Sequence, residues 1–274
     1  MTKPQPVFKA PFLDIATFMV IMAMVAGFPL LVWATHLGVV PLWAAVVIGT
    51  VLMNLSFTAW HECSHRNFSK VKIFNDIGGV LAAAASCYPG YYARRWEHLV
   101  HHRWEGVPGK DPVYYRIQTN FWRFPLDVLL VNWGPNKRTI DIPDSFHPIL
   151  PWMRVVDTLT NLSGLVAIGL SIYFGFWPAL VAGWVIPRVI VFVLHAYYIC
   201  YFPHHVDEGG YQLYRVRRLG FLGRFITVEQ SFHGLHHKWP YIPWHQYSTV
   251  VQDYMDELPE HDVQVLPADA PSSS

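Results

Sequence analysis

Charged residues are scarce in this sequence. Asp, Glu, Lys and Arg together make up only 14% of its 274 residues, whereas soluble domains carry about 25%. Hydrophobic residues account for 53%, so the composition excludes an ordinary soluble domain and indicates a membrane protein. The formal net charge is only +1, which provides no long-range attraction to nucleic acid.

Cysteine is scarce as well. The three cysteines, Cys63, Cys87 and Cys200, are too few and too odd in number for a disulfide framework. Their spacing matches no haem or iron–sulfur motif, so we expect this chain to bind neither cofactor. We interpret all three as small buried hydrophobic residues rather than metal ligands.

Histidine, in contrast, is concentrated in three short motifs. Eight of the fifteen histidines lie in them, and imidazole is the commonest metal ligand among side chains. A zinc site takes only three or four protein ligands, so eight clustered histidines favour two metal ions. Spacings of three and four residues place the rings of one motif on roughly one side of a helix. The motifs are His61-Glu-Cys-Ser-His65, His98-Leu-Val-His101-His102 and His233-Gly-Leu-His236-His237.

The first motif also admits a different interpretation. His61-Glu62-Cys63-Ser64-His65 is a formal match to H-E-x-x-H, in which both histidines bind zinc and Glu62 would be the general base. On a membrane helix it would indicate an intramembrane zinc metalloprotease. That site needs only one further ligand and leaves the other two motifs unexplained, so we favour two metals. Neutral imidazole binds iron, copper, zinc and nickel, and the motifs alone do not choose among them.

Four apolar stretches are long enough to cross a bilayer, which takes about 20 residues. Short turns join the first pair and the second pair, so we predict an all-α membrane protein with four transmembrane helices in two hairpins. A shorter stretch, 77–91, is expected to form an interfacial or re-entrant helix, and 125–133 is a further short apolar segment. The four predicted spans cover residues 15–35, 40–60, 159–176 and 179–198.

Lys and Arg avoid the two predicted turns. Twelve lie between Arg66 and Arg154, and five follow the fourth span. The positive-inside rule then predicts that both termini and all three histidine motifs are cytoplasmic, in a membrane of the bacterial inner type. We expect one domain over residues 1–256 and a polar, disordered tail over 257–274.

The three motifs and their flanks resemble the integral-membrane fatty acid desaturase and hydroxylase superfamily, which includes carotenoid ketolases and hydroxylases. The flanks are the run from Arg94 to Arg103 with Lys110-Asp111-Pro112, and the run from His236 to His245. The resemblance implies a four-span helical fold with a histidine-rich cytosolic cap, two non-haem irons, molecular oxygen and a separate electron donor. The implied iron ligands are His61, His65, His98, His101, His102, His233, His236 and His237.

The family commonly supplies one more ligand just after the fourth span. His204 is favoured for this position and His205 is the next choice. Family members often read Gln-Asn-Tyr before the third motif, where this chain has Gln230-Ser231-Phe232. The other histidines are expected to be ordinary surface or core residues: His36, His147, His195, His245 and His261.

Acidic side chains are expected to orient the metal-binding imidazoles. The candidates are Glu62, Glu97, Asp111 and Glu229, with His205 and His195 as further residues behind the ligands. Arg188 lies inside a predicted span, where a charge is costly, so it is expected to pair with a polar group or with the substrate. Pro187 before it is expected to kink the helix.

Removal of hydrogen from an unactivated methylene needs a cofactor, because no side chain can perform it. The expected reaction is fatty acyl desaturation or hydroxylation, and the alternative is hydroxylation or ketolation of a carotenoid β-ring. Without a cysteine-bound cofactor in this chain, electrons would come from a ferredoxin- or cytochrome-type donor with its reductase. Basic residues could dock that donor or face anionic lipid headgroups: Arg94, Arg95, Arg103, Arg215, Arg217 and Arg218.

Overall fold

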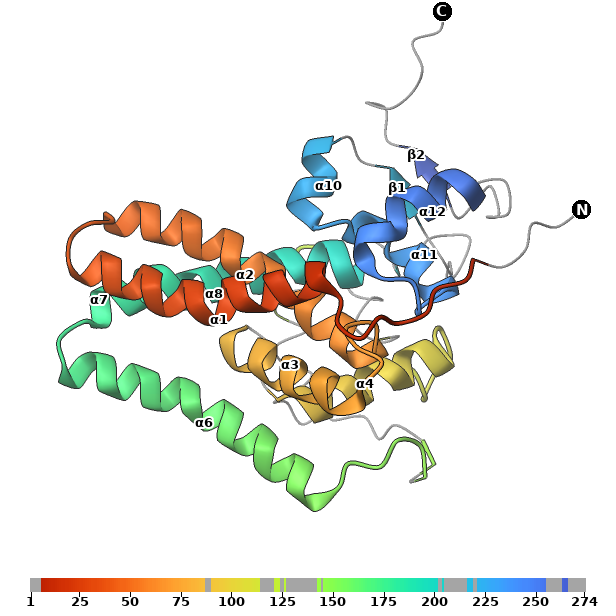
Figure 1. Ribbon diagram of the computed structural model, residues 1–274, viewed down its shortest axis with the longest axis horizontal. Helices are drawn as coiled ribbons and strands as arrows, with labels where there is room; N and C mark the ends of the chain where they lie inside the picture. Colours follow the sequence, from red (N-terminus) through yellow and green to blue (C-terminus); the bar gives the residue numbers. More distant parts are fainter. Residues whose placement is uncertain are drawn as a thin grey trace, which may run out of the picture. The chain divides into compact units, whose positions relative to one another are not determined.

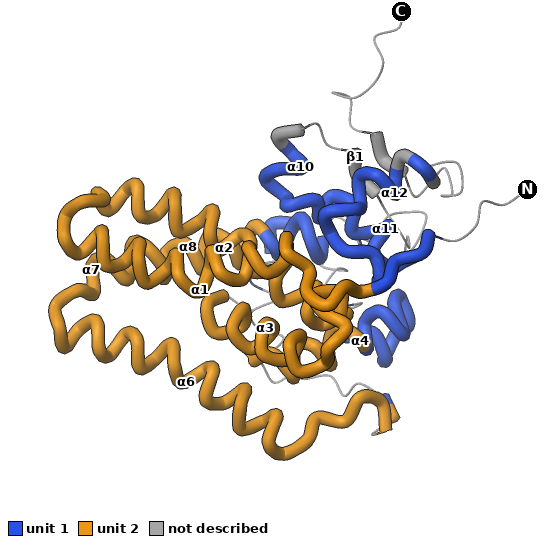
Figure 2. The backbone as a smooth tube through the Cα atoms, viewed as in Figure 1, with its two compact units in different colours: residues 1–9, 100–142, 195–274 blue, residues 10–99, 143–194 orange. Residues whose placement is uncertain are grey.

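The computed structural model describes residues 6–86, 90–113, 121–123, 126, 142–143, 145–201, 204, 216–218, 221–254 and 263–265. The described part is helical apart from one ladder of two short strands (Figure 1). The chain divides into two compact units (Figure 2). Unit 2 comprises residues 10–99 and 143–194, and unit 1 comprises residues 1–9, 100–142 and 195–274.

Unit 2 contains the long apolar helices. Its elements are α1 (Ile15–His36), α2 (Leu42–His65), α3 (Lys72–Ala85), α6 (Pro151–Tyr173), α7 (Trp177–Leu180), the π-helix η1 (Val181–Val185) and most of α8 (Ile186–His195). Helix α4 (Tyr91–Trp104) begins in unit 2 and continues without a break into unit 1. Short turns at 37–41 and 174–176 join α1 to α2 and α6 to α7, so the two predicted hairpins are confirmed.

Unit 1 is built from short elements. They are η2 (Ala196–Tyr201), β1 (Val216–Arg218), α10 (Phe221–Thr227), η3 (Gln230–Phe232), α11 (His233–Lys238), η4 (Trp244–Gln246), α12 (Tyr247–Tyr254) and β2 (Val263–Val265). Strands β1 and β2 pair in parallel, with Val216 opposite Val263. A core that includes Leu235, Trp239 and Tyr247 packs α11 against α12. Strand β2 lies within the predicted polar tail, 257–274, and the rest of that tail lies outside the described residues.

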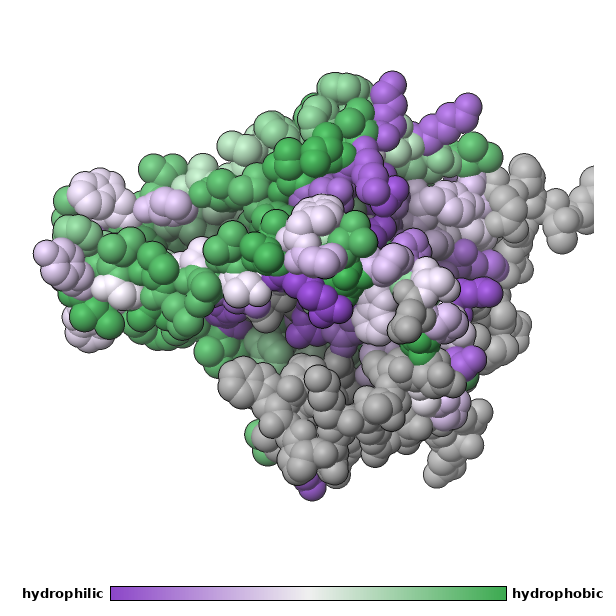
Figure 3. Space-filling model, turned by 90° about the horizontal axis from the view of Figure 1, so that it is seen from below, coloured by the Kyte–Doolittle hydropathy of each residue, from purple (hydrophilic) through white to green (hydrophobic). Residues whose placement is uncertain are grey.

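Four helical segments are long and apolar enough to cross a membrane, as predicted. They are Ile15–His36, Leu42–His65, Pro151–Tyr173 and Trp177–Tyr201. The third begins earlier than expected, because Pro151 starts α6 in the first-turn position that proline favours. Only 11% of its most apolar window is buried. Apolar side chains such as Leu159, Leu165 and Ile172 cover its outside, as the green surface in Figure 3 illustrates. This surface suits contact with lipid chains.

Segment 77–91 is confirmed as shorter than a span, since α3 has 14 residues. Segment 125–133 lies outside the described residues except residue 126. Pro187 follows the π-helix η1, a type of irregularity that occurs where the ordinary hydrogen-bond ladder is interrupted. There the fourth span comes so close to α2 that a Cβ on Gly49 would lie 2.3 Å from the carbonyl oxygen of Gly183. Small residues therefore allow two backbones to touch inside the membrane.

Candidate metal centre

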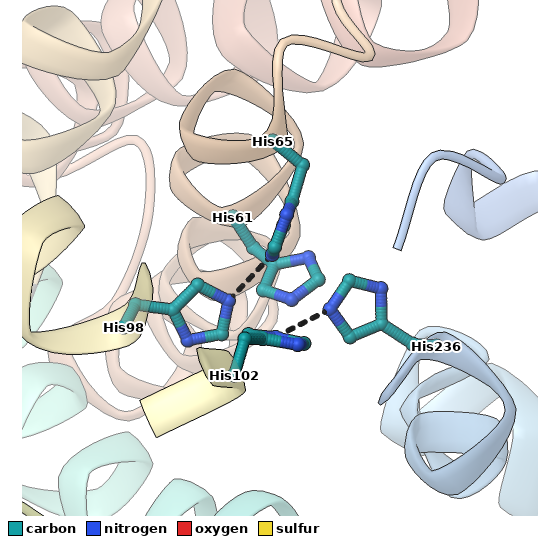
Figure 4. A group of neighbouring side chains, drawn as sticks. All are labelled: His61, His65, His98, His102 and His236. Atoms are coloured by element: carbon teal, nitrogen blue, oxygen red, sulfur yellow. Dashed lines mark hydrogen bonds between the residues drawn. The ribbon is translucent and has the colours of Figure 1, made fainter. Parts of the chain in front are cut away.

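Three histidines of unit 2 point their rings toward one another (Figure 4). His61 and His65 stand one turn apart at the end of α2, and His98 comes from α4. The Nε2 atoms of His65 and His98 are 2.7 Å apart. The ring centroid of His61 lies 4.9 Å from that of His65 and 4.8 Å from that of His98. Three imidazoles at these separations could bind one ion.

Contacts between α2 and α4 hold this group together. The last carbonyls of a helix have no partner within it, and here α4 supplies side-chain donors to two of them. Tyr91 Oη donates to the carbonyl oxygen of Cys63 at 3.0 Å, and Arg95 Nε donates to that of Ser64 at 3.0 Å. Helix α3 leaves room for the Tyr91 ring only because Gly79 has no side chain, since a Cβ there would lie 2.1 Å from that ring.

A second group lies in unit 1. His101, Glu105, His204 and His237 each offer one ligand atom, and these atoms all lie within 4.8 Å of one another. Three further histidines of the same unit, His233, His102 and His236, lie beside it. His233 Nε2 is 3.1 Å from His237 Nε2, and His102 Nε2 is 3.0 Å from His236 Nε2 (Figure 4). His101 and His102 of the second motif therefore converge in unit 1 with the third motif and His204.

Polar side chains behind these rings contact the opposite nitrogen, Nδ1. Asp111 lies 2.8 Å from Nδ1 of His101, and Tyr247 Oη lies 3.0 Å from Nδ1 of His236. Glu105 reaches two rings, with one oxygen 3.1 Å from Nδ1 of His204 and the other 2.9 Å from Nδ1 of His237. A carboxylate only accepts, so it favours the tautomer with the proton on Nδ1 and the lone pair on Nε2. That lone pair is what a metal ion binds.

Burial lowers the pKa of two of these imidazoles. It lowers the pKa of His237 well below its ordinary value, and the neighbouring His102, His204, His233 and His101 lower it further. Burial also lowers the pKa of His204, although Glu105 opposes that shift. For Asp111, burial alone would raise the pKa, but His101 and the backbone amides of Gly106 and Val113 reverse this effect and lower it. Neutral imidazoles beside a charged carboxylate are the forms that bind a cation.

The structure positions the other predicted residues as follows. Glu62 is fully buried, 3.3 Å from Nδ1 of His61, and accepts a hydrogen bond from Asn67. Glu97 pairs with Arg94, and Glu229 pairs with Arg224. Each of these two acids thus forms an ion pair with an arginine.

Three predictions concerned residues near the fourth span. His195 is buried and packs edge-on against Tyr198. The guanidinium of Arg188 lies 5.1 Å from the ring centroid of Trp184, a cation–π contact that partly compensates its charge.

The remaining predicted residues are His205 and the cysteines. His205 and Cys87 lie outside the described residues. Cys63 is buried and free, and Cys200 is half-buried and free.

Two functional candidates, Glu105 and Tyr247, were not predicted from the sequence. Glu105 follows His101 by four residues on α4, a spacing that could have indicated their common face. Tyr247 lies outside every histidine motif and reaches His236 only because α12 packs on α11. No local sequence signal marks such a contact.

Residues 37–267 match the sequence profile described as fatty acid desaturase. The chain belongs to the fatty acid desaturase family. This match covers all three histidine motifs and four-fifths of the chain, so the resemblance inferred from the motifs is confirmed. The buried imidazoles fit what a family of metal-dependent membrane oxidoreductases requires.

Individual members of the desaturase family are distant relatives. A zeaxanthin 4-ketolase of Chlamydomonas reinhardtii is 27% identical over 69% of this chain and 39% of its own length. An sn-1 acyl-lipid omega-3 desaturase (ferredoxin) of Nostoc sp. is 25% identical over 69% of this chain and 56% of its own length. An endoplasmic reticulum omega-3 fatty acid desaturase of Nicotiana tabacum is 26% identical over 68% of this chain and 58% of its own length. The chain thus spans about half the length of these relatives. No solved structure matches it.

Proposed function

We propose that this protein is a membrane-embedded, oxygen-dependent oxidoreductase with two non-haem irons that acts on C–H bonds of a long apolar substrate. The observation that carries the proposal is the grouping of buried and half-buried imidazoles at the end of a membrane span and again in unit 1. The metal, when bound, supplies the oxidising chemistry that side chains lack. Family membership supports iron as that metal.

Nine histidines are the proposed ligands: His61, His65, His98, His101, His102, His204, His233, His236 and His237. Helix α4 is central to this assignment, because it carries His98 of the unit 2 group and His101 and His102 of the unit 1 group. Residues 98 and 102 are four apart and therefore share a face of that helix. The proposal requires α4 as a whole to supply ligands to both irons.

The polar residues behind the ligands would fix the proton position and the orientation of the imidazoles. Asp111 and Glu105 would keep the proton of their imidazoles on Nδ1, and Tyr247 would bind the same atom of His236. Glu62 would orient His61. Their burial excludes water, which would otherwise compete for these hydrogen bonds.

A fatty acyl chain, desaturated or hydroxylated, is the proposed substrate. Two of the relatives named above are described as fatty acid or acyl-lipid desaturases, which supports this class. A carotenoid ring is the second candidate, because another relative is described as a zeaxanthin 4-ketolase. Small differences in how the reacting carbon is held would decide the product.

We also propose that both termini are cytoplasmic, in a bacterial-type inner membrane, on the strength of the basic residues that flank the spans. Electrons would come from a separate ferredoxin- or cytochrome-type donor and its reductase. The zinc protease interpretation loses its support, since Glu62 contacts a ligand histidine on its Nδ1 side and the family match explains all three motifs.

The test is to purify the protein in detergent, measure its metals, and analyse a carotene-producing host that expresses it. The expected result is two irons per chain and new double bonds or hydroxyl groups in fatty acids. Oxygenated β-rings in the carotenoids would select the second substrate class. One zinc per chain with no iron would refute the proposal.

A further inference from the structure

Asp157 lies within the membrane span α6, and its side chain is buried. Its Oδ1 accepts the backbone N–H of Tyr92 at 2.9 Å, and its Oδ2 accepts that of Ala93 at 2.8 Å. Both amides belong to the first turn of α4. One carboxylate on α6 therefore caps the N-terminus of a different helix.

The start of α4 needs such a partner. The first N–H groups of a helix have no acceptor within it, and its N-terminus carries partial positive charge. The preceding residue, Gly90, has φ +70° and no side chain that could cap the helix. A Cβ on Gly90 would lie 3.1 Å from the carboxyl carbon of Asp157, so glycine leaves the space that the carboxylate occupies.

Other contacts hold the same end of α4. The rings of Tyr92 and Trp152 on α6 pack edge-on with centroids 5.2 Å apart. Tyr91 and Arg95 bind the last carbonyls of α2. The start of α4 is thus held between two membrane spans, and Asp157 is the group that binds its backbone from α6.

An ionisable residue inside a membrane span is costly and is usually kept for a function. We propose that Asp157 is a positioning residue for the metal centre, fixing the start and rotation of α4 and thereby the place of His98. This inference rests on the proposed function, because the position of α4 bears on activity only if its histidines bind iron. Asp157 itself acts through the helix and touches no ligand ring in this role.

The test compares Asp157→Ala, which removes both acceptor oxygens, with Asp157→Asn, which keeps the shape and one acceptor. The matched control is Thr158→Ala on the same helix, because the exposed Thr158 hydroxyl donates to the carbonyl of Arg154 within α6. Two quantities are measured in detergent: hydrogen exchange of the peptide covering residues 90–98 in the metal-free protein, and the dissociation constant for ferrous iron. The visible spectrum of the cobalt(II)-loaded protein reports ligand geometry.

In Asp157→Ala we expect faster exchange confined to the start of α4, a changed cobalt spectrum and iron binding weakened about tenfold, the scale seen when residues that orient ligands are lost. Asp157→Asn should fall between alanine and wild type, and Thr158→Ala should match wild type. Gly90→Ala, which crowds the carboxylate from the other side, should reproduce the effect if Asp157→Ala does not fold.

Unchanged iron affinity and cobalt spectrum in the folded Asp157 variants, or in Gly90→Ala, would overturn the positioning role while leaving the proposed function intact. A general loss of stability without localised exchange at α4 in Asp157→Asn would also overturn it. Failure of the wild-type protein to bind iron would instead refute the proposed function, and the positioning role with it.

Discussion

Glu105 lies 3.1 Å from Nδ1 of His204 and 2.9 Å from Nδ1 of His237, so one carboxylate contacts two imidazoles that come from different parts of the chain. His204 follows Glu105 by 99 positions in the sequence and His237 follows it by 132, yet Glu105 contacts both in unit 1. This sharing makes Glu105 the residue on which the geometry of the unit 1 group depends most.

Replacement of Glu105 by glutamine should therefore impair metal binding. An amide keeps the size of the side chain but cannot accept from both imidazoles with two equivalent oxygens. We expect iron affinity to fall about 10–100-fold, measured by titration with ferrous iron. Glu97→Gln is the control, since Glu97 also lies on α4 but pairs with Arg94. Equal iron affinity in both variants would contradict the role assigned to Glu105.

Tyr247→Phe should weaken the protein without changing its core volume. The hydroxyl lies 3.0 Å from Nδ1 of the buried His236. When a buried polar group loses its hydrogen-bond partner, the free energy of unfolding falls by about 1–3 kcal/mol. We expect a lower melting temperature and weaker iron binding. Tyr241→Phe is the control, because the more exposed Tyr241 hydroxyl donates to the backbone carbonyl of Pro6 and not to a histidine of the three motifs. Equal melting temperatures and equal iron affinities in the two variants would refute this prediction.

Gly79→Ala should destabilise unit 2. The new Cβ would lie 2.1 Å from the Tyr91 ring, which must then move from its place beneath the end of α2. Overpacking of this kind costs about 1–3 kcal/mol. Gly169→Ala on α6 is the matched control, as nothing lies within 4 Å of its added Cβ. Thermal unfolding should separate the two variants, and a Gly79→Ala protein as stable as Gly169→Ala would contradict the packing argument.

Acid should destabilise the metal-free protein. The pKa values of His204 and His237 are lowered in the folded state, so below about pH 6.5 the unfolded chain binds protons that the folded chain does not. Stability is then constant above that pH and falls below it, by at most about 1.4 kcal/mol per pH unit for each histidine. Melting temperatures at pH 7.5 and 5.5 measure this, and a higher value at pH 5.5 would contradict it.

Much of this architecture could be predicted from the sequence, because it depends on local patterns. Apolar runs of sufficient length predicted the four spans, and the histidine spacing predicted that His61 and His65 share a face of α2. The expected partners of the rings were harder to predict. Asp111 does contact His101, but Glu229 is held by Arg224, whose guanidinium lies close enough to form several hydrogen bonds.

The residues that were missed depend on contacts between distant segments. Tyr247 reaches His236 through the packing of α12 on α11, and Asp157 reaches α4 from a membrane span 64 residues or more away in sequence. No periodicity or motif indicates such pairs, since their geometry exists only after the helices pack. Pro187 was expected to kink its helix, and the structure has a π-helical turn just before it.

The carbonyls of Cys63 and Ser64 are bound by residues 28 and 31 positions further along the chain. The Cys63 carbonyl also accepts the backbone N–H of Arg66 at 3.2 Å, whereas Arg95 reaches the Ser64 carbonyl from the next helix but one. Both side-chain contacts at the end of the second span can therefore form only after the start of α4 has been synthesised, so this turn cannot acquire its native surroundings while α2 is the last helix made.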